Sequence, residues 1–335
     1  MPPSDARLRR LLAAFSGLRV VAIGDLMLDE FIWGKVSRIS PEAPVPVVNV
    51  TGESYYPGGA ANVARNLREF TPRTAVMGIG GTDAAGCRLI ELLGDCGIDT
   101  SGVQRDATLP TAVKTRIVAR NQQVVRVDRE RKVALTPPQL ELAMRQVEQV
   151  ARQVDAIVVA DYGKGFLNQQ LADHICRVAR EQNRILAVDP HPYTSLAWPG
   201  ATAIKPNRAE AFLAAGVPVA EPVSPPLADR PLLAVGEQLL ARWGCGMVLI
   251  TLGEDGMLLL EPGRPPVHIP TRAQEVFDVS GAGDTAISVL TLALAAGATP
   301  AEAADLANRA SGIAVGKLGT ATVPAAEIAA TFSPA

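Results

Sequence analysis

The segment Asp278-Val279-Ser280-Gly281-Ala282-Gly283-Asp284 decides the fold, because it places small residues and a carboxylate directly before a long apolar run over 287–294. Such a run is typical of a buried helix. The small residues at 281–283 let backbone N–H groups approach an anion, and the helix dipole favours negative charge there. We expect a phosphate site, with Asp284 in the first turn as the base for an attacking hydroxyl. Taken alone, the segment fits an ordinary helix cap equally well.

Before this helix, short apolar runs alternate with Ala- and Leu-rich stretches. The runs predict strands that are buried on both faces of a parallel sheet and are covered by helices on both sides. The predicted strands cover 19–24, 74–78, 156–160, 185–188, 202–204 and 247–250. Polar or Gly-rich residues follow each run, and ligands bind beyond the carboxyl ends of such strands. We therefore expect the strand ends to share one crevice.

Two regions break this alternation and lack crossover helices. The first, about 31–56, is rich in valine and proline, and the second, about 112–130, has the pattern of a hairpin with its turn near Asn121. Both are expected to be antiparallel strands that project from the main sheet as a small lid. An ordinary sheet edge fits the pattern equally well.

A second polar group lies nearer the N-terminus. Asp25 and Asp29 follow the first predicted strand, and Gly58-Gly59-Ala60-Ala61-Asn62 opens an Ala-rich helix. Carboxylate acceptors beside an amide suit the hydroxyl groups of a sugar. Simple turn chemistry at the glycines, with Asp29 as a solvated side chain, is the alternative.

Two further segments suit a nucleotide and its metal ion. Asn207 and Glu210 stand three residues apart at a predicted helix start after Lys205, and they could order Mg²⁺ through its waters. A plain helix start with glutamate near the dipole is the commoner meaning of this pattern. The glycines of the segment 251–256 could admit a nucleotide or make a hairpin.

Basic residues recur in the expected lid and crevice, where a phosphorylated substrate would need some of them. Most exposed arginines are solvated charges, so two or three are expected to matter. The candidates are Arg38, Arg116, Arg120, Arg126, Arg129 and Lys164.

Composition and absent motifs narrow the function. The 335 residues are 48% hydrophobic, and 32 basic against 34 acidic side chains lack the positive footprint of a nucleic-acid-binding protein. Four cysteines and three histidines show no zinc spacing. No signal peptide or membrane anchor is predicted, so a cytoplasmic protein is expected. The Walker and GxGxxG loops are missing, which disfavours Walker-type ATPases and simple dehydrogenases.

The segments 58–62 and 278–284 together resemble the two signature motifs of the ribokinase-like (PfkB) carbohydrate kinases. Within that family, four segments look like the D-glycero-β-D-manno-heptose 7-phosphate kinases. These segments cover 37–47, 120–123, 273–276 and 315–320. The resemblance spans roughly residues 18–325, nearly the whole chain.

The resemblance implies a ribokinase-like α/β fold, with a mostly parallel sheet, helices on both faces and a small antiparallel β-lid that builds a homodimer. It also implies ATP- and Mg²⁺-dependent phosphorylation of the C1 hydroxyl of D-glycero-β-D-manno-heptose 7-phosphate. The product would be the 1,7-bisphosphate used for the lipopolysaccharide inner core. One carbohydrate kinase domain is expected over 1–335. Many relatives carry a fused adenylyltransferase, but no HxGH motif occurs here, so a separate adenylyltransferase and a separate phosphatase are expected.

The resemblance implies roles for individual residues as well. Asp284 matches the catalytic base, and Gly281, Ala282 and Gly283 match the anion hole. Asn207 and Glu210 match an element associated with Mg²⁺ and phosphate. Asp278 and Ser280 match a monovalent-cation loop in some relatives, although Ser280 replaces the more usual threonine. The expected nucleotide contacts are Lys205, Asn207, Thr251, Gly253, Gly256 and Asn308.

The expected substrate contacts combine matched positions with a hypothesis from charge. They are Asp25, Asp29, Arg38, Gly58, Gly59, Asn62, Arg116, Asn121, Arg126, Asp161 and Lys164. The hypothesis concerns the sugar phosphate, which is assigned to Arg116, Asn121, Arg126 or Lys164. Three alternatives stay open, namely a kinase of the same fold for another sugar, a catalytically idle ATP or sugar sensor, and a nucleotide-dependent oxidoreductase.

Overall fold

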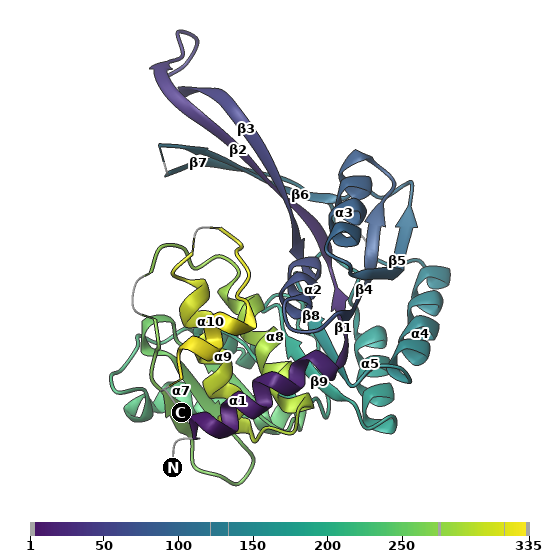
Figure 1. Cartoon of the computed structure of the whole chain (residues 1–335), viewed down its shortest axis with the longest axis vertical. Coiled ribbons are helices and arrows are strands. Elements are labelled where there is room, and N and C mark those ends of the chain that lie inside the picture. Colours follow the sequence, from purple (N-terminus) through teal and green to yellow (C-terminus); the bar gives the residue numbers. More distant parts are fainter. Residues whose placement is uncertain (1–3, 121, 133, 274–275, 318, 333–335) are drawn as a thin grey trace.

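The computed structural model describes residues 4–120, 122–132, 134–273, 276–317 and 319–332. Its main body is a nine-stranded sheet (Figure 1). In spatial order the strands are β13 (Val267–Ile269), β12 (Met257–Leu260), β11 (Val248–Thr251), β10 (Ala203–Ile204), β9 (Ile185–Asp189), β8 (Ala156–Ala160), β1 (Arg19–Gly24), β4 (Arg73–Gly81) and β5 (Asp99–Asp106). Asn121, an expected substrate contact, lies outside the described residues.

All six predicted strands are confirmed, and they pair in parallel as β11-β10-β9-β8-β1-β4. Three strands of this sheet were not predicted. β5 is largely polar and only partly buried, so it lacks the apolar run that marks the others. β12 and β13 add antiparallel strands at the opposite edge, each four residues or fewer in length.

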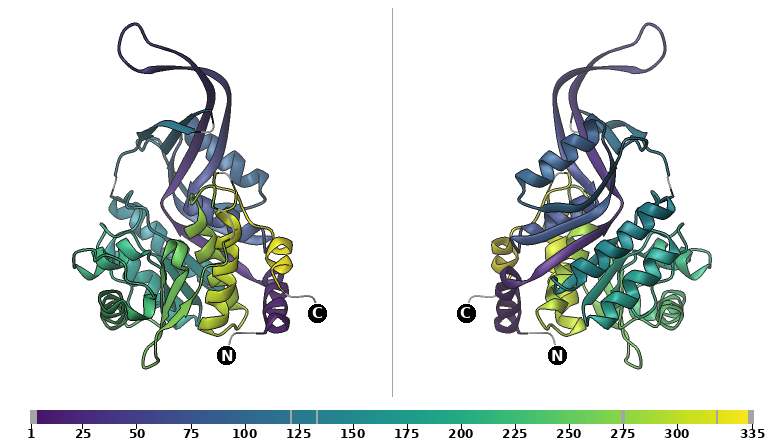
Figure 2. Two further views of the ribbon diagram at one scale, coloured as in Figure 1. Left: turned by 90° about the vertical axis from the view of Figure 1, so that its left-hand side faces the viewer. Right: turned by 90° about the vertical axis from the view of Figure 1, so that its right-hand side faces the viewer.

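Helices cover both faces of this sheet, as expected. Two separate clusters of buried side chains pack against its two faces. One face carries α1 (Asp5–Ala14), α2 (Ala60–Arg68), α3 (Ala84–Asp95), α8 (Ala282–Ala295), α9 (Pro300–Ala314) and α10 (Ala325–Ala330). The other face carries α4 (Pro137–Ala151), α5 (Gln169–Glu181), α6 (Arg208–Ala215) and α7 (Arg230–Trp243). The first and last of these helices, α1 and α10, contact each other (Figure 2).

A second, four-stranded sheet stands away from the main body and forms the lid (Figure 1). Its spatial order is β3 (Pro46–Gly59), β2 (Leu26–Ile39), β6 (Ala112–Ala119) and β7 (Gln122–Arg129). The small antiparallel sheet is thus confirmed, since β2 pairs with β3 and β6 with β7 in antiparallel fashion. The central pair differs, because β2 and β6 are parallel. The reason is connectivity. β2 and β6 follow β1 and β5, which point the same way in the main sheet, and both continue outward side by side.

Helix α8 is the central element of its layer. Every residue from Thr285 to Leu294 is buried, because α8 lies between the sheet, α2 and α9. Thr299 and Glu302 form a capping box at the start of α9. Among the residues that the structure describes, no helix has both the length and the apolar character needed to cross a bilayer.

The packing of α8 yields a prediction about stability. Leu290→Ala should lower the free energy of unfolding by about 2–5 kcal/mol, because Leu290 is fully buried and its truncation leaves a cavity. Leu142→Ala is the matched control, since Leu142 is 38% exposed on α4 and should change stability by less than about 0.5 kcal/mol. Urea denaturation measures both. Equal effects of the two changes would contradict the central position of α8.

Candidate active site

Two cavities meet at the segment 278–284. The first, of about 790 Å³, is lined by Ala282, Gly283 and Asp284 together with residues that follow β9, β10 and β11. The second, of about 600 Å³, is lined by Asp278 and Ser280 together with lid residues from β2, β3 and β6. One segment therefore borders both a cavity of the main sheet and a cavity under the lid.

Asp284 sits in the first turn of α8, as predicted, and both of its oxygens accept a hydrogen bond. The Tyr162 hydroxyl donates to Oδ1 at 2.6 Å, and the Asn62 amide donates to Oδ2 at 2.6 Å. Burial raises the pKa of Asp284 to about 6, although these two hydrogen bonds act to lower it. The carboxylate is therefore held in one orientation, and its pKa lies close to the range that suits a general base.

Gly281 allows this turn to form. It caps α8 with a φ of 80°, the left-handed region that glycine enters without strain. Ala282 N donates to the carbonyl of Val279, but the next N–H groups of the first helical turn have no preceding carbonyl in the helix and are available to an anion. A Cβ atom at Gly283 would lie 3.6 Å from Lys205 Nζ, which places an ammonium group beside this helix start. The arrangement suits a phosphate.

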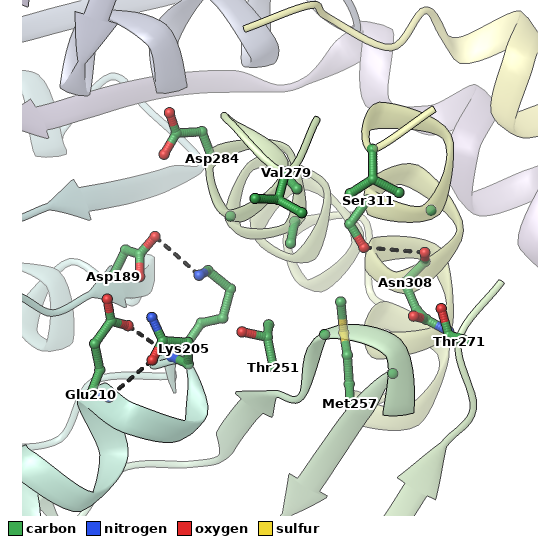
Figure 3. A pocket seen from close by; sticks show the side chains of 18 of the residues that line it. Asp189, Lys205, Glu210, Thr251, Met257, Thr271, Val279, Asp284, Asn308 and Ser311 are labelled. Atoms are coloured by element: carbon green, nitrogen blue, oxygen red, sulfur yellow. Dashed lines mark hydrogen bonds and ion pairs between the residues drawn. The ribbon is translucent and has the colours of Figure 1, made fainter. Parts of the chain in front are cut away.

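Asp189 and Lys205 form an ion pair in the first cavity (Figure 3). Asp189 ends β9 and Lys205 follows β10, and their side chains approach to 3.0 Å between Oδ2 and Nζ. Lys205 is only 3% exposed. Burial raises the pKa of Asp189 to about 6 even though Lys205 acts to lower it, and Glu210 raises it further.

Asn207 and Glu210 cap the start of α6. The Asn207 side chain accepts from Glu210 N at 2.9 Å, and the Glu210 carboxylate accepts from Asn207 N at 2.7 Å. Both residues also line the first cavity. The two interpretations of this pair are therefore compatible, because a capping carboxylate keeps lone pairs for a water molecule.

All six expected nucleotide contacts line the first cavity. They are Lys205, Asn207, Thr251, Gly253, Gly256 and Asn308. They come from three segments, namely the turn after β10, the residues 251–256 at the end of β11, and α9. Figure 3 shows Lys205, Thr251 and Asn308 arranged around one space. The Asn308 amide donates to the carbonyl of Pro270 at 2.6 Å, which ties α9 to the chain after β13. The prediction of nucleotide contacts thus selects residues that share one cavity.

The expected substrate contacts separate into groups. Asp29 forms an ion pair with Arg116 at 2.6 Å, and Arg116 lines the second cavity. Gly58 packs against Asp29, because a Cβ there would lie 2.7 Å from its Oδ2. Gly59 caps α2, whose first turn carries Asn62. These residues lie where β2 and β3 of the lid adjoin α2.

Asp25 and Asp161 directly follow β1 and β8. The Asp25 carboxylate accepts from the backbone N–H groups of Tyr162, Lys164 and Phe166, each at 3.0 Å, so it holds the loop after β8. Asp161 lines the first cavity and accepts from Thr194 Oγ1 at 2.6 Å.

Three expected basic contacts line neither cavity. Arg38 is exposed near the tip of the β2–β3 hairpin. Arg126 pairs with Asp128 at 2.9 Å, and Lys164 pairs with Glu130 at 2.7 Å. A neighbouring carboxylate already holds Arg126 and Lys164, so these two are less available to a phosphate.

In the loop expected to bind a monovalent cation, the carboxylate of Asp278 is hydrogen-bonded to the backbone. Asp278 accepts from Ser280 N at 2.9 Å and from Gly319 N at 3.0 Å. Burial acts to raise the pKa of Asp278, but these hydrogen bonds outweigh it and lower that pKa. In the part of the chain that the structure describes, no three His, Cys, Asp or Glu side chains gather in a way that could hold a metal ion.

Sequence reasoning missed Tyr162, Asp189 and Arg65. Tyr162 follows a predicted strand end, and Asp189 ends one, so their positions were a usable signal. Arg65 lines the second cavity one helical turn after Asn62. Its helical spacing from Asn62 was the available signal, but only the tertiary structure shows that this face of α2 borders the second cavity.

Comparison with known families adds a clear match. The model of the pfkB family of carbohydrate kinases matches residues 18–327. Among curated proteins, the bifunctional protein HldE of Desulfatibacillum aliphaticivorans is 43% identical over 95% of this chain, and that of Geobacter sulfurreducens is 42% identical over 95%. That of Mesorhizobium japonicum is 39% identical over 98%. This chain spans 64% of the length of each of these relatives.

Solved structures share the fold at low sequence identity. A ribokinase of Arabidopsis thaliana complexed with ribose and ATP has a TM-score of 0.71 and 18% identity, over 94% of this chain and 99% of its own. Phosphofructokinase-2 of Escherichia coli in complex with potassium has a TM-score of 0.73 and 17% identity, over 93% and 97%. These likenesses establish the ribokinase-like fold.

The buried carboxyl of Asp284 predicts a pH-dependent stability. The pKa of this carboxyl is about 6 in the folded chain, against an ordinary value of 3.8 that applies to the unfolded chain. Between these values the folded chain binds more protons than the unfolded chain, so the free energy of unfolding falls as the pH rises. Relative to wild type, Asp284→Asn should therefore gain up to about 3 kcal/mol between about pH 4 and pH 7.

Urea denaturation at several pH values measures this gain. Thr285→Val is the control, because it changes the neighbouring residue without removing an ionisable group, and its difference from wild type should be independent of pH. A difference for Asp284→Asn that stays flat would contradict the raised pKa.

Proposed function

We propose that this chain, which belongs to the pfkB family of carbohydrate kinases, phosphorylates the C1 hydroxyl of D-glycero-β-D-manno-heptose 7-phosphate with ATP. The product would be the 1,7-bisphosphate. Membership of the family makes the chain a sugar kinase. The sugar, the phosphorylated position and the place in lipopolysaccharide inner-core biosynthesis are the proposal.

One observation carries the phosphoryl-transfer chemistry, namely that the segment 278–284 borders both cavities. A nucleotide in the first cavity and a sugar in the second would meet at Asp284 and at the amides of the same helix start. Phosphoryl transfer needs little beyond such positioning and charge stabilisation. The same segment would thus supply both the base and the anion site.

The side chains have distinct tasks in this reaction. Asp284 would take the proton of the attacking hydroxyl, since its carboxylate is held by Tyr162 and Asn62. Lys205 and the first-turn amides of α8 would balance negative charge on the phosphates. Asp189 would keep Lys205 in place through their ion pair.

The first cavity fits ATP with a hydrated magnesium ion. Thr251, Gly253, Gly256 and Asn308 would contact the nucleotide, and Asn207 and Glu210 would hold Mg²⁺ through water. Bound with ATP, Mg²⁺ neutralises charge on the phosphates. Because Mg²⁺ keeps several of its waters, it does not need to be enclosed by protein ligands. Asn207 and Glu210 in the wall of the first cavity would be enough to hold it. A monovalent cation near Asp278 and Ser280 stays a prediction.

The choice of heptose 7-phosphate rests on two supports. Four segments of the chain resemble heptose 7-phosphate kinases, and the matching curated relatives are bifunctional proteins named HldE. Arg116 in the second cavity suits a substrate that already carries a phosphate. Another sugar phosphate is the nearest alternative, because the fold does not select a substrate.

The expectation of a separate adenylyltransferase is not supported. The curated relatives are named as bifunctional proteins, and this chain spans 64% of their length. We propose only that residues 1–335 include one carbohydrate kinase domain, with the lid strands as part of it. A phosphatase would act on the 1,7-bisphosphate in the next step.

The lid also suits a homodimer. Its outer strand β7 is exposed along its whole length and carries Val124, Val125 and Val127 with 37–47% of their surface accessible. On the β2–β3 hairpin, Ile39 is 60% exposed. Apolar side chains and an open strand edge favour association with a second copy.

Val125→Lys should convert this dimer to a monomer, because it places a charge in the apolar contact. Analytical ultracentrifugation measures the change in mass. Val267→Lys is the matched control, since Val267 is 40% exposed on β13 at the far edge of the main sheet. A monomeric wild type, or equal dissociation by the control, would contradict the lid dimer.

Release of ADP tests the proposed reaction. Purified protein with Mg²⁺ and ATP should release ADP with D-glycero-β-D-manno-heptose 7-phosphate, and much less with its α-anomer, ribose or fructose 6-phosphate. Asp284→Asn should fold and bind both substrates but lose about 10²- to 10⁴-fold in kcat, the usual contribution of a general base.

Asp95→Asn, an exposed carboxylate on α3, serves as the control and should keep the wild-type rate. Activity on another sugar alone would overturn the substrate and keep the mechanism. Near-normal turnover of Asp284→Asn would reject Asp284 as the base. Binding of ATP and sugar without any ADP release would favour a sensor.

A further inference from the structure

We propose that Arg65 and Arg116 form a binding site for the phosphate group that the sugar already carries, in the cavity under the lid. This inference rests on the proposed function and deepens it, because it assigns the second cavity to a phosphomonoester of a sugar. It adds Arg65, a residue with no expected role, and it moves the phosphate away from Arg126 and Lys164.

The first support is that Arg65 has no ion-pair partner in contact with it, although Glu69 and Asp29 act from a greater distance to raise its pKa. Among the described residues no carboxylate lies within 4.0 Å of its guanidinium, and its buried Nη1 has no hydrogen-bond partner. Burial lowers the pKa of Arg65. A buried donor on a charged group costs stability unless a partner satisfies it. An anionic ligand in the adjoining cavity would be that partner.

The second support is that other unsatisfied polar atoms lie close by. Asn62 Oδ1 and Thr320 Oγ1 are also buried without a partner. They flank the same glycine, since a Cβ at Gly281 would lie 3.5 Å from Asn62 Nδ2 and 3.5 Å from Thr320 Cα. Thr320 lines the second cavity together with Arg65, whereas Asn62 lies beside it. A hydroxyl and a guanidinium with unpaired atoms thus belong to one cavity wall, which suits a phosphorylated sugar.

The third support is the wall of the cavity. Phe31 and Trp33 stack at 5.6 Å, and Tyr56 meets Phe31 edge-on at 5.7 Å. Arg116 lies over Phe31 at 5.2 Å, and Arg65 lies over Tyr56 at 5.4 Å. Both guanidinium groups are therefore held against neighbouring rings, which orients them and limits water around them.

The acidic groups in and beside this cavity already have hydrogen-bond or ion-pair partners. Asp29 pairs with Arg116, and Asp278 accepts from two backbone N–H groups. Arg116 keeps further donors after its contact with Asp29, because a guanidinium carries five N–H groups. One fully unpaired arginine and one partly paired arginine thus face the space that the ligand would fill.

The position along α2 fits the two ends of the substrate. Asn62 contacts the base Asp284, and Arg65 follows three residues later, about 4.5 Å further along the helix axis. The hydroxyl that reacts would lie at Asn62 and Asp284. The existing phosphate would lie beyond it, at the end of the cavity where the long side chain of Arg65 reaches.

The test compares phosphorylated and unphosphorylated substrates. Arg65→Gln should lower kcat/KM for D-glycero-β-D-manno-heptose 7-phosphate by about ten- to hundredfold, mainly through KM, because one charge-assisted contact is lost. The low rate on the unphosphorylated heptose should not change. Arg65→Lys should recover part of the loss, and thermal unfolding verifies that each variant is folded.

Arg68→Gln is the matched control, since Arg68 lies one turn further on the same helix and lines neither cavity. It should leave the preference for the phosphorylated substrate unchanged. The proposal is overturned if Arg65→Gln lowers the rates on both heptoses equally, or lowers neither.

Calorimetric titration without nucleotide separates this site from the proposed function. The ligands are heptose 7-phosphate, fructose 6-phosphate, ribose 5-phosphate and inorganic phosphate. If the wild type phosphorylates a different sugar phosphate, or binds one without turnover, the proposed function fails. Weaker binding of that sugar phosphate to Arg65→Gln than to the wild type would still support the phosphate site. The proposed site is overturned if the wild type and Arg65→Gln bind the sugar phosphates equally well and differ only in their binding of inorganic phosphate.

Discussion

The contact between α2 and α8 is the constraint on which the site depends. Asn62 donates to Asp284 at 2.6 Å, Thr285 donates to Asn66 at 2.8 Å, and Ser288 donates to the carbonyl of Val63 at 3.4 Å. These bonds join segments more than 200 residues apart in the chain, in a fully packed interior. Asp284 is thus fixed by the core, so the base needs no ligand to reach its position.

This placement has an electrostatic cost, which the neighbouring side chains reduce. Burial raises the pKa of Asp284 and of Asp189 to about 6, and the carboxylate of Asp189 acts to raise the pKa of Asp284 further. Lys205 opposes both effects from its place beside Asp189. The loop after β8 supplies Tyr162, and Asp25 holds that loop through three backbone hydrogen bonds. Asp25 therefore supports the base through Tyr162.

Local sequence patterns predicted the secondary-structure elements better than the tertiary contacts between them. The parallel strands, the start of α8 at Gly281 and the capping box of α9 follow from apolar runs and helix-start residues. The parallel pairing of β2 with β6 and the contact of Asn62 with Asp284 arise from tertiary packing, which no local pattern encodes. For the same reason charge alone selected both Arg116, which lines the second cavity, and Arg38, which lies near the lid tip.

The parallel register of the lid links it to the site. β2 and β6 align Phe31 with Arg116, so the guanidinium lies over the ring and reaches Asp29 two residues before it. An antiparallel pair could not place this residue from β6 there with the same connections. The groups that face a sugar phosphate thus belong to the lid and α2, whereas the groups that face a nucleotide follow strands of the main sheet. Because α2 and α8 join the two sets, changes in the lid could alter substrate choice while the position of Asp284 stays the same.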